Sequence, residues 1–364
     1  MRAEETFADL VTRGLRAPIC VTWELTYACN LSCVHCLSAS GRRDARELRT
    51  DEALALIDAL VELGVFYANV GGGEPTLRRD LDDLVAHAAA RGLGMRISTN
   101  GWGIDARRAR RLAVPGVDVQ VSLDGADAAS NDAVRGAGSF VRARQALALL
   151  AEAAPRPPTM SVVVTRRNVG QLDALAALAA DLGARLRLTR LRPAGRGLEV
   201  WDGLRLGASD QRALHAWLVA HPAVATGDSF FHLSPLGAAI PGLNVCGAGR
   251  AVALIDPIGD VYACPFAIAE RFRAGSIRTT PLGELWRDSP ALRALRQPDA
   301  GGACPTCEAF DACRGGCPAA KHFTGLAPGD PDPECVLGRA PAAHATRLAH
   351  GSDHTRHTPA RSAP

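Results

Sequence analysis

Short apolar runs rich in β-branched residues alternate with helix-period segments along the first half of the chain. The apolar runs predict six strands, over 19–25, 66–70, 94–99, 117–123, 160–165 and 185–191. The segments between them predict helices over 51–63, 80–91, 105–113, 139–153 and 171–182. Thr50 to Glu52 are typical of a helix N-terminus, and Gly64 is typical of a helix end. Strands separated by helices indicate a parallel sheet, so about six units predict a partial (β/α) barrel.

The pattern changes after residue 238. Short strands, turns and cysteines replace the long alternation, and residues 251–263 predict a hairpin that turns at Pro257 and Gly259 and presents Cys264. From 339 onward the chain is rich in Ala, Pro, His and Arg without periodicity, which predicts a disordered tail. We therefore expect an N-terminal extension (1–18), an α/β core (19–238), a small cysteine-rich domain (239–338) and a tail (339–364).

Composition and charge exclude several classes of protein. The 364 residues are 47% hydrophobic, enough for a sizeable core, and the net charge is only +3. Arginines are interleaved with Asp and Glu, which indicates solvated helix faces and no nucleic-acid partner. The sequence contains no run of 18 apolar residues, and its first ten residues, MRAEETFADL, lack an apolar signal segment. We expect a soluble, cytoplasmic protein with no membrane partner.

The eleven cysteines are distributed as metal ligands are. None lies between residues 37 and 245, whereas a disulfide-stabilised protein is usually short and cysteine-dense throughout. Cys20 stands apart at the start of an apolar strand, and we expect a buried, inert thiol there.

Cys29, Cys33 and Cys36 form a C-x3-C-x2-C triplet directly after the first predicted strand. A structural zinc site takes four ligands, and a cubane iron–sulfur cluster has four irons that normally bind four thiolates. Three thiolates leave one iron open to bind a substrate. In a βα barrel the triplet would lie at the carboxyl ends of the strands, where such folds carry their chemistry.

The triplet in this position resembles the signature of the radical S-adenosylmethionine (SAM) enzymes. The resemblance implies that the open iron binds the amino and carboxylate groups of SAM and that an electron from the cluster releases a 5′-deoxyadenosyl radical. Gly72-Gly73-Glu74-Pro75 resembles the family's GGEP motif, which contacts the methionyl ammonium, although an ordinary βα turn has the same composition.

Other polar residues at predicted strand ends extend this resemblance. It implies that Ser98, Asn100, Ser122 and Asp124 surround the SAM ribose and carboxylate and that Arg135 pairs with that carboxylate. Each of them is also compatible with a helix cap or a turn. The resemblance places His35 in the adenine pocket, where it is not a metal ligand.

The later cysteines resemble the SPASM extension of radical SAM enzymes, which carries two auxiliary iron–sulfur clusters. By this resemblance one cluster is held by Cys304, Cys307, Cys313 and Cys335. The other is held by Cys246, Cys264 and Cys317. This second set counts three cysteines, which leaves an open iron, a non-cysteine ligand or a smaller core. By spacing alone, a zinc ribbon is the alternative.

Several stretches, including FYANVGGGEPT, GDSFFHLSPLG and IDPIGDVYACPFAI, resemble the mycofactocin maturase family. This implies a ribosomal precursor peptide ending in Val-Tyr as substrate. The tyrosine would be oxidatively decarboxylated, and the valine β-carbon would then bond to the former tyrosine α-carbon to form a pyrrolidinone. The alternatives are sulfatase-maturing, quinone-precursor or thioether-forming maturases, an iron–sulfur electron carrier and a zinc-binding interaction protein.

Two partners follow from these expectations. About 18 residues before the first strand are too few to bury a core. We therefore expect a separate small chaperone to bind the precursor leader, as the family resemblance also implies. A flavodoxin- or ferredoxin-type protein is the expected electron donor.

Overall fold

The computed structural model describes residues 15–227, 230–237, 240, 246–296, 304 and 306–339. Most of the predicted N-terminal extension and nearly all of the predicted tail therefore lie outside the described residues. In the described part of the chain, no helix has the length and apolar character needed to cross a membrane.

Six parallel strands form the first part of a curved sheet. They are β1 (Cys20–Thr26), β2 (Tyr67–Gly72), β3 (Gly94–Thr99), β4 (Val117–Ser122), β5 (Thr159–Val164) and β6 (Arg185–Arg190). Each strand pairs with the one before it. All six strands were predicted, with bounds that agree within two residues.

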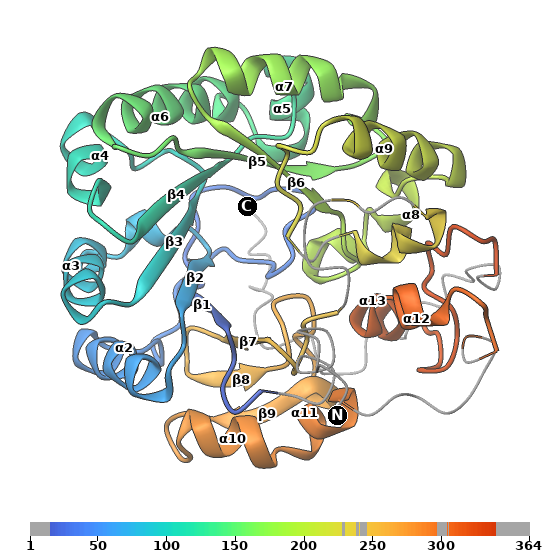
Figure 1. Ribbon diagram of the computed structural model, residues 1–364. Helices are drawn as coiled ribbons and strands as arrows, with labels where there is room; N and C mark the ends of the chain where they lie inside the picture. Colours follow the sequence, from blue (N-terminus) through green and yellow to red (C-terminus); the bar gives the residue numbers. More distant parts are fainter. Residues whose placement is uncertain are drawn as a thin grey trace, which may run out of the picture.

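Helices cover the outer side of this sheet, as Figure 1 shows. The predicted ones are α2 (Thr50–Leu63), α3 (Leu81–Arg91), α4 (Ala106–Leu112), α6 (Ser139–Ala153) and α7 (Leu172–Asp181). Along β1, Val21, Trp23 and Leu25 belong to the main apolar core, while the alternate positions are polar. Side chains of a strand alternate between faces, so the polar positions face the inside of the curved sheet. The short helix α5 (Ala128–Arg135) was not predicted.

The start of α2 corrects one detail of the sequence analysis. Arg49, with extended backbone, is the N-cap, and the Glu52 carboxylate accepts a hydrogen bond of 2.9 Å from its N–H. The Thr50 hydroxyl, predicted to serve the helix N-terminus, donates instead to Asp80 at 2.7 Å, because α3 packs beside α2. The helix ends as predicted at Gly64, which has left-handed backbone.

The cysteine-rich segment adds three strands to the same sheet. β7 (Val252–Ile255) pairs with β1 in parallel, and β8 (Asp260–Tyr262) and β9 (Arg273–Ser276) follow in antiparallel order. The predicted hairpin over 251–263 is therefore confirmed. Its strands continue the core sheet, so one nine-stranded sheet crosses the expected boundary between the two domains. The sheet is open, with β6 and β9 at its edges.

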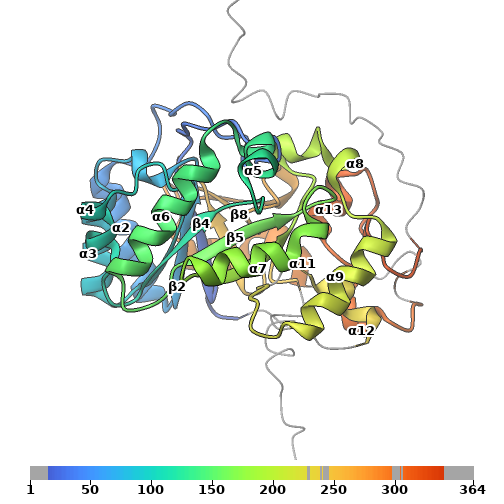
Figure 2. The same cartoon turned by 90° about the horizontal axis from the view of Figure 1, so that it is seen from above.

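The other main regular elements of the described chain are helices, most of them short. It contains α8 (Trp201–Leu204), α9 (Ala208–Ala220), the 3-10 helix η4 (Phe231–Leu236), α10 (Leu282–Asp288), α11 (Pro290–Arg296), α12 (Phe310–Cys313) and α13 (Pro318–Phe323). Figures 1 and 2 both place α12 and α13 at the opposite end of the molecule from α2 and α3.

Buried ion pairs join the other edge of the parallel sheet to the cysteine-rich segment. Arg190, at the end of β6, pairs with Asp332 and Glu334, and all three side chains are about 4% exposed. One Asp332 oxygen also accepts a hydrogen bond of 2.8 Å from the Cys317 N–H. Burial alone would raise the pKa of Asp332, but the Arg190 guanidinium lowers it below its usual range. The cysteine-rich segment is thus attached to both edges of the six-stranded parallel sheet. β7 pairs with β1 at one edge, and Asp332 and Glu334 form ion pairs with Arg190 of β6 at the other.

We predict that Arg190→Met destabilises the fold, because it leaves the buried Asp332 and Glu334 without their ion-pair partner. The free energy of unfolding, measured by anaerobic urea denaturation, should fall by about 3–5 kcal/mol. The matched control is Arg185→Met on the same strand, where an arginine that is 51% exposed lies 3.7 Å from Asp118. That control should lose less than about 1 kcal/mol. Equal losses in the two variants would show that the buried pair does not join the two parts.

Candidate functional site

Cys29, Cys33 and Cys36 lie in a loop after β1 that has no helix or strand between these residues. The loop returns on itself, since the Cys29 N–H donates to the Gly41 carbonyl at 2.9 Å. The Cys36 N–H donates to the Cys33 carbonyl at 3.3 Å. All three side chains are half-buried, and none is in a disulfide. We name residues 27–41 the cysteine loop.

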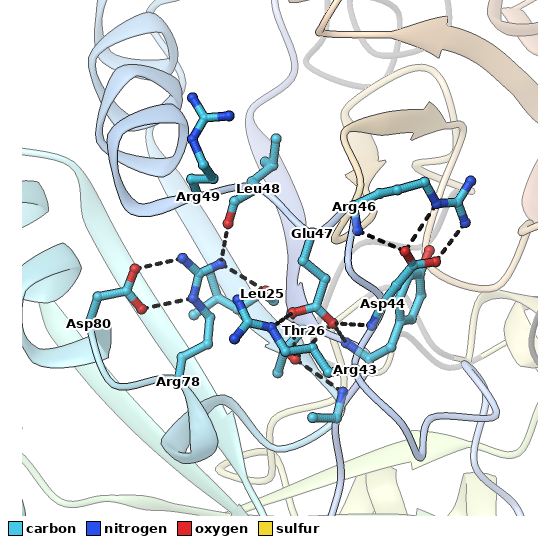
Figure 3. A network of polar contacts seen from close by, with 12 residues as sticks. Leu25, Thr26, Arg43, Asp44, Arg46, Glu47, Leu48, Arg49, Arg78 and Asp80 are labelled. Carbon is cyan, nitrogen blue, oxygen red and sulfur yellow. Dashed lines mark hydrogen bonds and ion pairs between the residues drawn. The ribbon is translucent and has the colours of Figure 1, made fainter.

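Glu47 holds the cysteine loop at its entry and just after its exit (Figure 3). Its buried carboxylate accepts hydrogen bonds from the Thr26 hydroxyl at 3.0 Å and the Tyr27 N–H at 2.8 Å. Beyond the loop, the same carboxylate accepts hydrogen bonds from the Arg43 Nε at 3.1 Å and from the Asp44 N–H at 3.2 Å. One carboxylate therefore fixes the distance between the two ends of the loop.

Arg78 completes the network drawn in Figure 3. Its Nη1 donates to the carbonyls of Leu25 and Leu48, at 3.0 and 3.1 Å, and so ties the end of β1 to the start of α2. Asp80 accepts two hydrogen bonds from the same guanidinium and neutralises it.

The predicted GGEP motif packs against the start of the cysteine loop. The Gly73 N–H donates to the Thr26 carbonyl at 2.8 Å, and the Glu74 N–H donates to the Ala28 carbonyl at 2.8 Å. A Cβ at Gly73 would lie 2.0 Å from the Ala28 carbonyl oxygen, so only glycine allows this approach. Gly72 has a φ of +103°, and a Cβ there would meet the Thr26 carbonyl at 2.7 Å. The close approach observed at these glycines is to neighbouring backbone.

The segment after β6, at the far edge of the parallel sheet, also binds the cysteine loop. Arg196, in the 3-10 helix η3 (Gly195–Leu198), donates through Nε to the Cys33 carbonyl at 2.9 Å and through Nη1 to the Ser40 carbonyl at 3.0 Å. Its own N–H donates to the Cys36 carbonyl at 2.9 Å. A Cβ at Gly195 would lie 2.5 Å from that carbonyl. The segment after β6 therefore locks the loop after β1.

The Glu74 side chain binds the end of β3. Its buried carboxylate accepts from the Thr99 hydroxyl at 2.7 Å and the Asn100 N–H at 2.7 Å. It also accepts from the Thr76 hydroxyl at 2.6 Å, in the 3-10 helix η1 that Pro75 begins. Burial raises the pKa of Glu74, and these hydrogen bonds oppose the rise. In this structure the carboxylate positions two strand ends, so its predicted contact with the methionyl ammonium stays a prediction.

Arg135 and Asp124 form a buried ion pair, and His35 contacts the same Asp124 carboxylate. The Asp124 carboxylate lies 2.7 Å from the Arg135 Nε and 2.8 Å from the His35 Nε2, and it accepts the Val163 N–H at 2.7 Å. Burial would raise the pKa of Asp124, but Arg135 and then His35 lower it below its usual range. Asp124 is thus the partner that Arg135 has here, and the pairing with a SAM carboxylate stays a prediction.

Three more predicted residues lie at the ends of β3 and β4. Asn100 donates through its side chain to Asn30 in the cysteine loop at 2.9 Å. Ser98 accepts a hydrogen bond from Gln120, and Ser122 is half-buried as the last residue of β4. Parallel strands bring their carboxyl ends to one edge of the sheet. The predicted SAM-binding residues and the cysteine triplet therefore lie at the same edge, which we call the mouth of the barrel.

The charges around the triplet suit thiolates that bind a cluster. Burial raises the pKa of Cys33, while the guanidiniums of Arg135 and Arg196 lower it. Burial raises the pKa of Cys29 to about 11. Burial therefore favours the protonated thiol at Cys29 and Cys33, and the two cations near Cys33 favour its anionic, metal-bound form. The three cysteines fit the open cluster predicted from their spacing.

Comparison with known proteins identifies the family. The Radical SAM superfamily model matches residues 23–179, and the model of an iron–sulfur cluster-binding domain, SPASM, matches residues 246–308. The mycofactocin maturase MftC of Mycolicibacterium smegmatis is 58% identical over 354 residues, which cover 95% of this chain and 90% of that protein. That of Mycobacterium ulcerans is 59% identical over 330 residues, covering 89% of each. The chain belongs to the mycofactocin maturases.

More distant relatives share the fold of this mycofactocin maturase family member. A PqqA peptide cyclase of Streptomyces rochei is 33% identical over 88% of this chain and 90% of that protein. The crystal structure of Streptococcus suis SuiB bound to S-adenosylmethionine superposes with a TM-score of 0.70 at 19% identity, covering 85% of this chain and 75% of that one. These agree with the predicted radical SAM core and SPASM extension.

The structure brings four of the later cysteines to one cavity. Its lining includes Cys304, Cys307, Cys313 and Cys335, the four residues that the SPASM resemblance groups together. In the described residues no three His, Cys, Asp or Glu side chains converge on a point where they could hold one metal ion. A zinc ion binds each sulfur at about 2.3 Å, whereas a cubane binds one thiolate on each of four irons, so its ligands stay farther apart. The four cysteines line one cavity and supply the thiolate donors that an iron–sulfur cluster requires, and their assignment as the ligands of one cluster stays a prediction.

The other three cysteines share a separate apolar cluster. Cys246, Cys264 and Cys317 are all buried there, together with Phe231 and Trp286. The Cys317 sulfur accepts the Ala320 N–H at 3.4 Å at the start of α13. The fourth ligand of this set, left open by the sequence, stays open. Cys20 is buried as predicted, and its sulfur accepts from the Asn69 amide at 3.1 Å.

Several residues that build this site were missed from the sequence. Glu47 and Arg196 contact the cysteine loop from outside every motif, although the glycines on either side of Arg196 were a signal of close packing. A buried carboxylate pair at the β1–β7 seam was also missed. Burial and the charge of Asp256 raise the pKa of Glu24 to about 8. Burial also raises the pKa of Asp256 to about 6, although the Asp256 carboxylate accepts a hydrogen bond from the Tyr27 hydroxyl at 2.8 Å, which opposes the rise.

We predict that Glu74→Gln weakens SAM binding without emptying the cluster. A glutamine amide cannot accept from both the Thr76 side and the Asn100 N–H, so the two strand ends lose their common anchor. A hydrogen bond to a charged group contributes about 1.5–3 kcal/mol, so SAM affinity should fall by roughly tenfold or more. Equilibrium binding and iron content measure the two effects, with the exposed Glu62→Gln on α2 as control. Unchanged affinity would make Glu74 a structural turn residue alone.

Proposed function

We propose that this protein is the radical SAM maturase of the mycofactocin precursor peptide. The observation that carries the proposal is the shared mouth, where the cysteine triplet meets the polar ends of β2, β3 and β4 in a chain 58% identical to a curated mycofactocin maturase. Cys29, Cys33 and Cys36 would hold the cluster, which supplies the electron that cleaves SAM. The backbone of Gly72 to Pro75, with Ser98, Asn100, Ser122, Asp124 and Arg135, would line the SAM site.

The auxiliary clusters would lie in the cysteine-rich segment. We assign one to the cavity of Cys304, Cys307, Cys313 and Cys335, and the other to the apolar cluster of Cys246, Cys264 and Cys317. Two domains follow, a radical SAM core over 19–238 and a SPASM segment over 239–338, which share one sheet. Three clusters in total are the expected cofactor content beside SAM.

The reaction follows from the family and from where the site lies. The C-terminal Val-Tyr of the precursor would enter the mouth of the barrel beside the cysteine loop. The tyrosine undergoes oxidative decarboxylation with SAM as the two-electron oxidant, which leaves as methionine and 5′-deoxyadenosine. The peptide becomes lighter by carbon dioxide and two hydrogen atoms. The ring closure between valine and the former tyrosine α-carbon gives an isomer of that product.

We predict that the triple variant Cys29→Ala, Cys33→Ala, Cys36→Ala loses one cluster and all 5′-deoxyadenosine formation. The reconstituted protein is incubated anaerobically with SAM, reductant and precursor peptide, and iron content, nucleoside and peptide mass are measured. The other two clusters should remain, because their cysteines lie elsewhere in the fold. Cys20→Ala, a buried cysteine outside the sets, should behave as wild type. Continued nucleoside formation by the triple variant would refute the assignment, and a different peptide mass would point to another maturase reaction.

We propose three further features of its cellular setting. A small chaperone binds the precursor leader, because ordering a flexible peptide costs conformational entropy that a pocket for two residues does not offset. A flavodoxin or ferredoxin supplies electrons, and the protein works in the cytoplasm. A solved relative, SuiB, is described with its precursor peptide SuiA bound, which supports a peptide as the substrate here.

We predict that the chaperone raises turnover of the full-length precursor at peptide concentrations well below saturation. A shortened peptide without the leader should show no such gain, since the chaperone has nothing to bind. Rates with and without the chaperone, together with a titration for complex formation, measure the effect. Equal rates for the full-length precursor would mean that this chain recognises its peptide unaided.

A further inference from the structure

His232 is a polar residue of the auxiliary cavity that the cysteine sets do not explain. It lies in η4, which packs against both α9 and α12, and its side chain lines the cavity of Cys304, Cys307, Cys313 and Cys335. The residue is 4% exposed. A buried polar ring at this position requires a partner on each nitrogen.

Among the described residues, one of its two ring nitrogens has a hydrogen-bond partner. Nε2 lies 2.9 Å from the Gln211 side-chain oxygen of α9. Nδ1 is buried and makes no hydrogen bond among the described residues. An unsatisfied buried nitrogen costs about 1–3 kcal/mol, so a group in the cavity that meets Nδ1 removes a real penalty.

The charge of the cavity decides what Nδ1 does. Four thiolates and the sulfides of a cluster are negative, so they attract an N–H and repel a nitrogen lone pair. A half-turn of the Gln211 amide places its NH2 against Nε2 and leaves the ring proton on Nδ1, and the two amide orientations have the same shape. Burial and then the nearby Arg190 lower the pKa of His232 well below its usual value, so the ring is neutral and this tautomer is the one that supplies the donor at Nδ1.

The charged groups that act on the ring are Arg190, Asp332 and Arg192. Arg192 carries only donors, so it cannot accept a hydrogen bond from an Nδ1–H. Arg190 pairs with Asp332 and Glu334, and Asp332 also accepts the Cys317 N–H. The four cysteines supply one thiolate for each iron of a cubane, so histidine is not needed as a ligand. Among the described residues none bonds to Nδ1, and the sulfur atoms of a cluster in this cavity are acceptors for an Nδ1–H.

We propose that His232 donates a hydrogen bond from Nδ1 to a sulfur of the auxiliary cluster held by Cys304, Cys307, Cys313 and Cys335, and thereby raises the reduction potential of that cluster. The inference rests on the ligand set proposed above. One-electron reduction adds one negative charge to the cluster, and an N–H donor stabilises the reduced form more than the oxidised form. His232 thus acts only on the reduction potential of the cluster, and no covalent bond in the protein is made or broken.

The test is a reductive titration of the reconstituted full chain, followed by electron paramagnetic resonance. Cys304→Ala first identifies the signal of this cluster by removing it. His232→Phe should then shift that signal's midpoint to more negative potential by a roughly tenfold change in the reduction equilibrium, which is about 59 mV for one electron. His232→Gln, which keeps an N–H donor, should shift it less. His87→Phe on α3, a partly exposed histidine paired with Asp58, is the control and should leave it unchanged.

Different failures have different meanings. If Cys304→Ala removes no signal, the ligand set is wrong and the inference falls with it. If that signal is assigned but His232→Phe and His232→Gln both leave its midpoint unchanged, the hydrogen bond is absent and the ligand set stands. A pulsed measurement with 15N-labelled histidine should show a weak nitrogen coupling that both His232 variants lack. A strong coupling would make His232 an iron ligand and would also overturn the proposal.

Discussion

The cysteine loop has no helix or strand to fix its shape, and the site depends on how neighbouring segments hold it. Glu47 binds its entry and the chain just beyond its exit, the backbone after Gly72 packs on its start, and Arg196 crosses its middle. Two of these contacts come so close that a Cβ would clash, which explains glycine at Gly73 and Gly195. Three cysteines spaced for one cluster are useful only when their loop is fixed in this way.

The buried charged side chains at the ends of the strands are likewise held by partners from other segments. Asp124, just after β4, is paired with Arg135. Arg190, the last residue of β6, is paired with Asp332 and Glu334 of the cysteine-rich segment, so each of these buried charges has a partner of opposite sign. The Arg190 pairs also reach the backbone of Cys317. Stability of the sheet edge and placement of an auxiliary cysteine are therefore served by one ion-pair group.

The two later sets of cysteines occupy different surroundings. Cys246, Cys264 and Cys317 lie among apolar side chains, while the set with Cys304 shares its cavity with His232 and Asp332. Burial and hydrogen bonds to sulfur are levers that a protein has on the potential of a cluster.

The sequence alone determined the strands and helices of the core, the hairpin over 251–263, and the spacing of the cysteine triplet before Gly72 to Pro75. Periodicity and turn residues report local structure, so these features are readable without a fold. Only the tertiary structure decided that β7 pairs with β1 in the core sheet and that Glu47, Arg196 and His232 reach cysteines or cysteine-bearing loops. Arg190 meets Asp332 across 142 positions of sequence, and Arg196 meets Cys33 across 163. Contacts between residues so far apart leave no periodic signal, because the folded sheet alone brings them together.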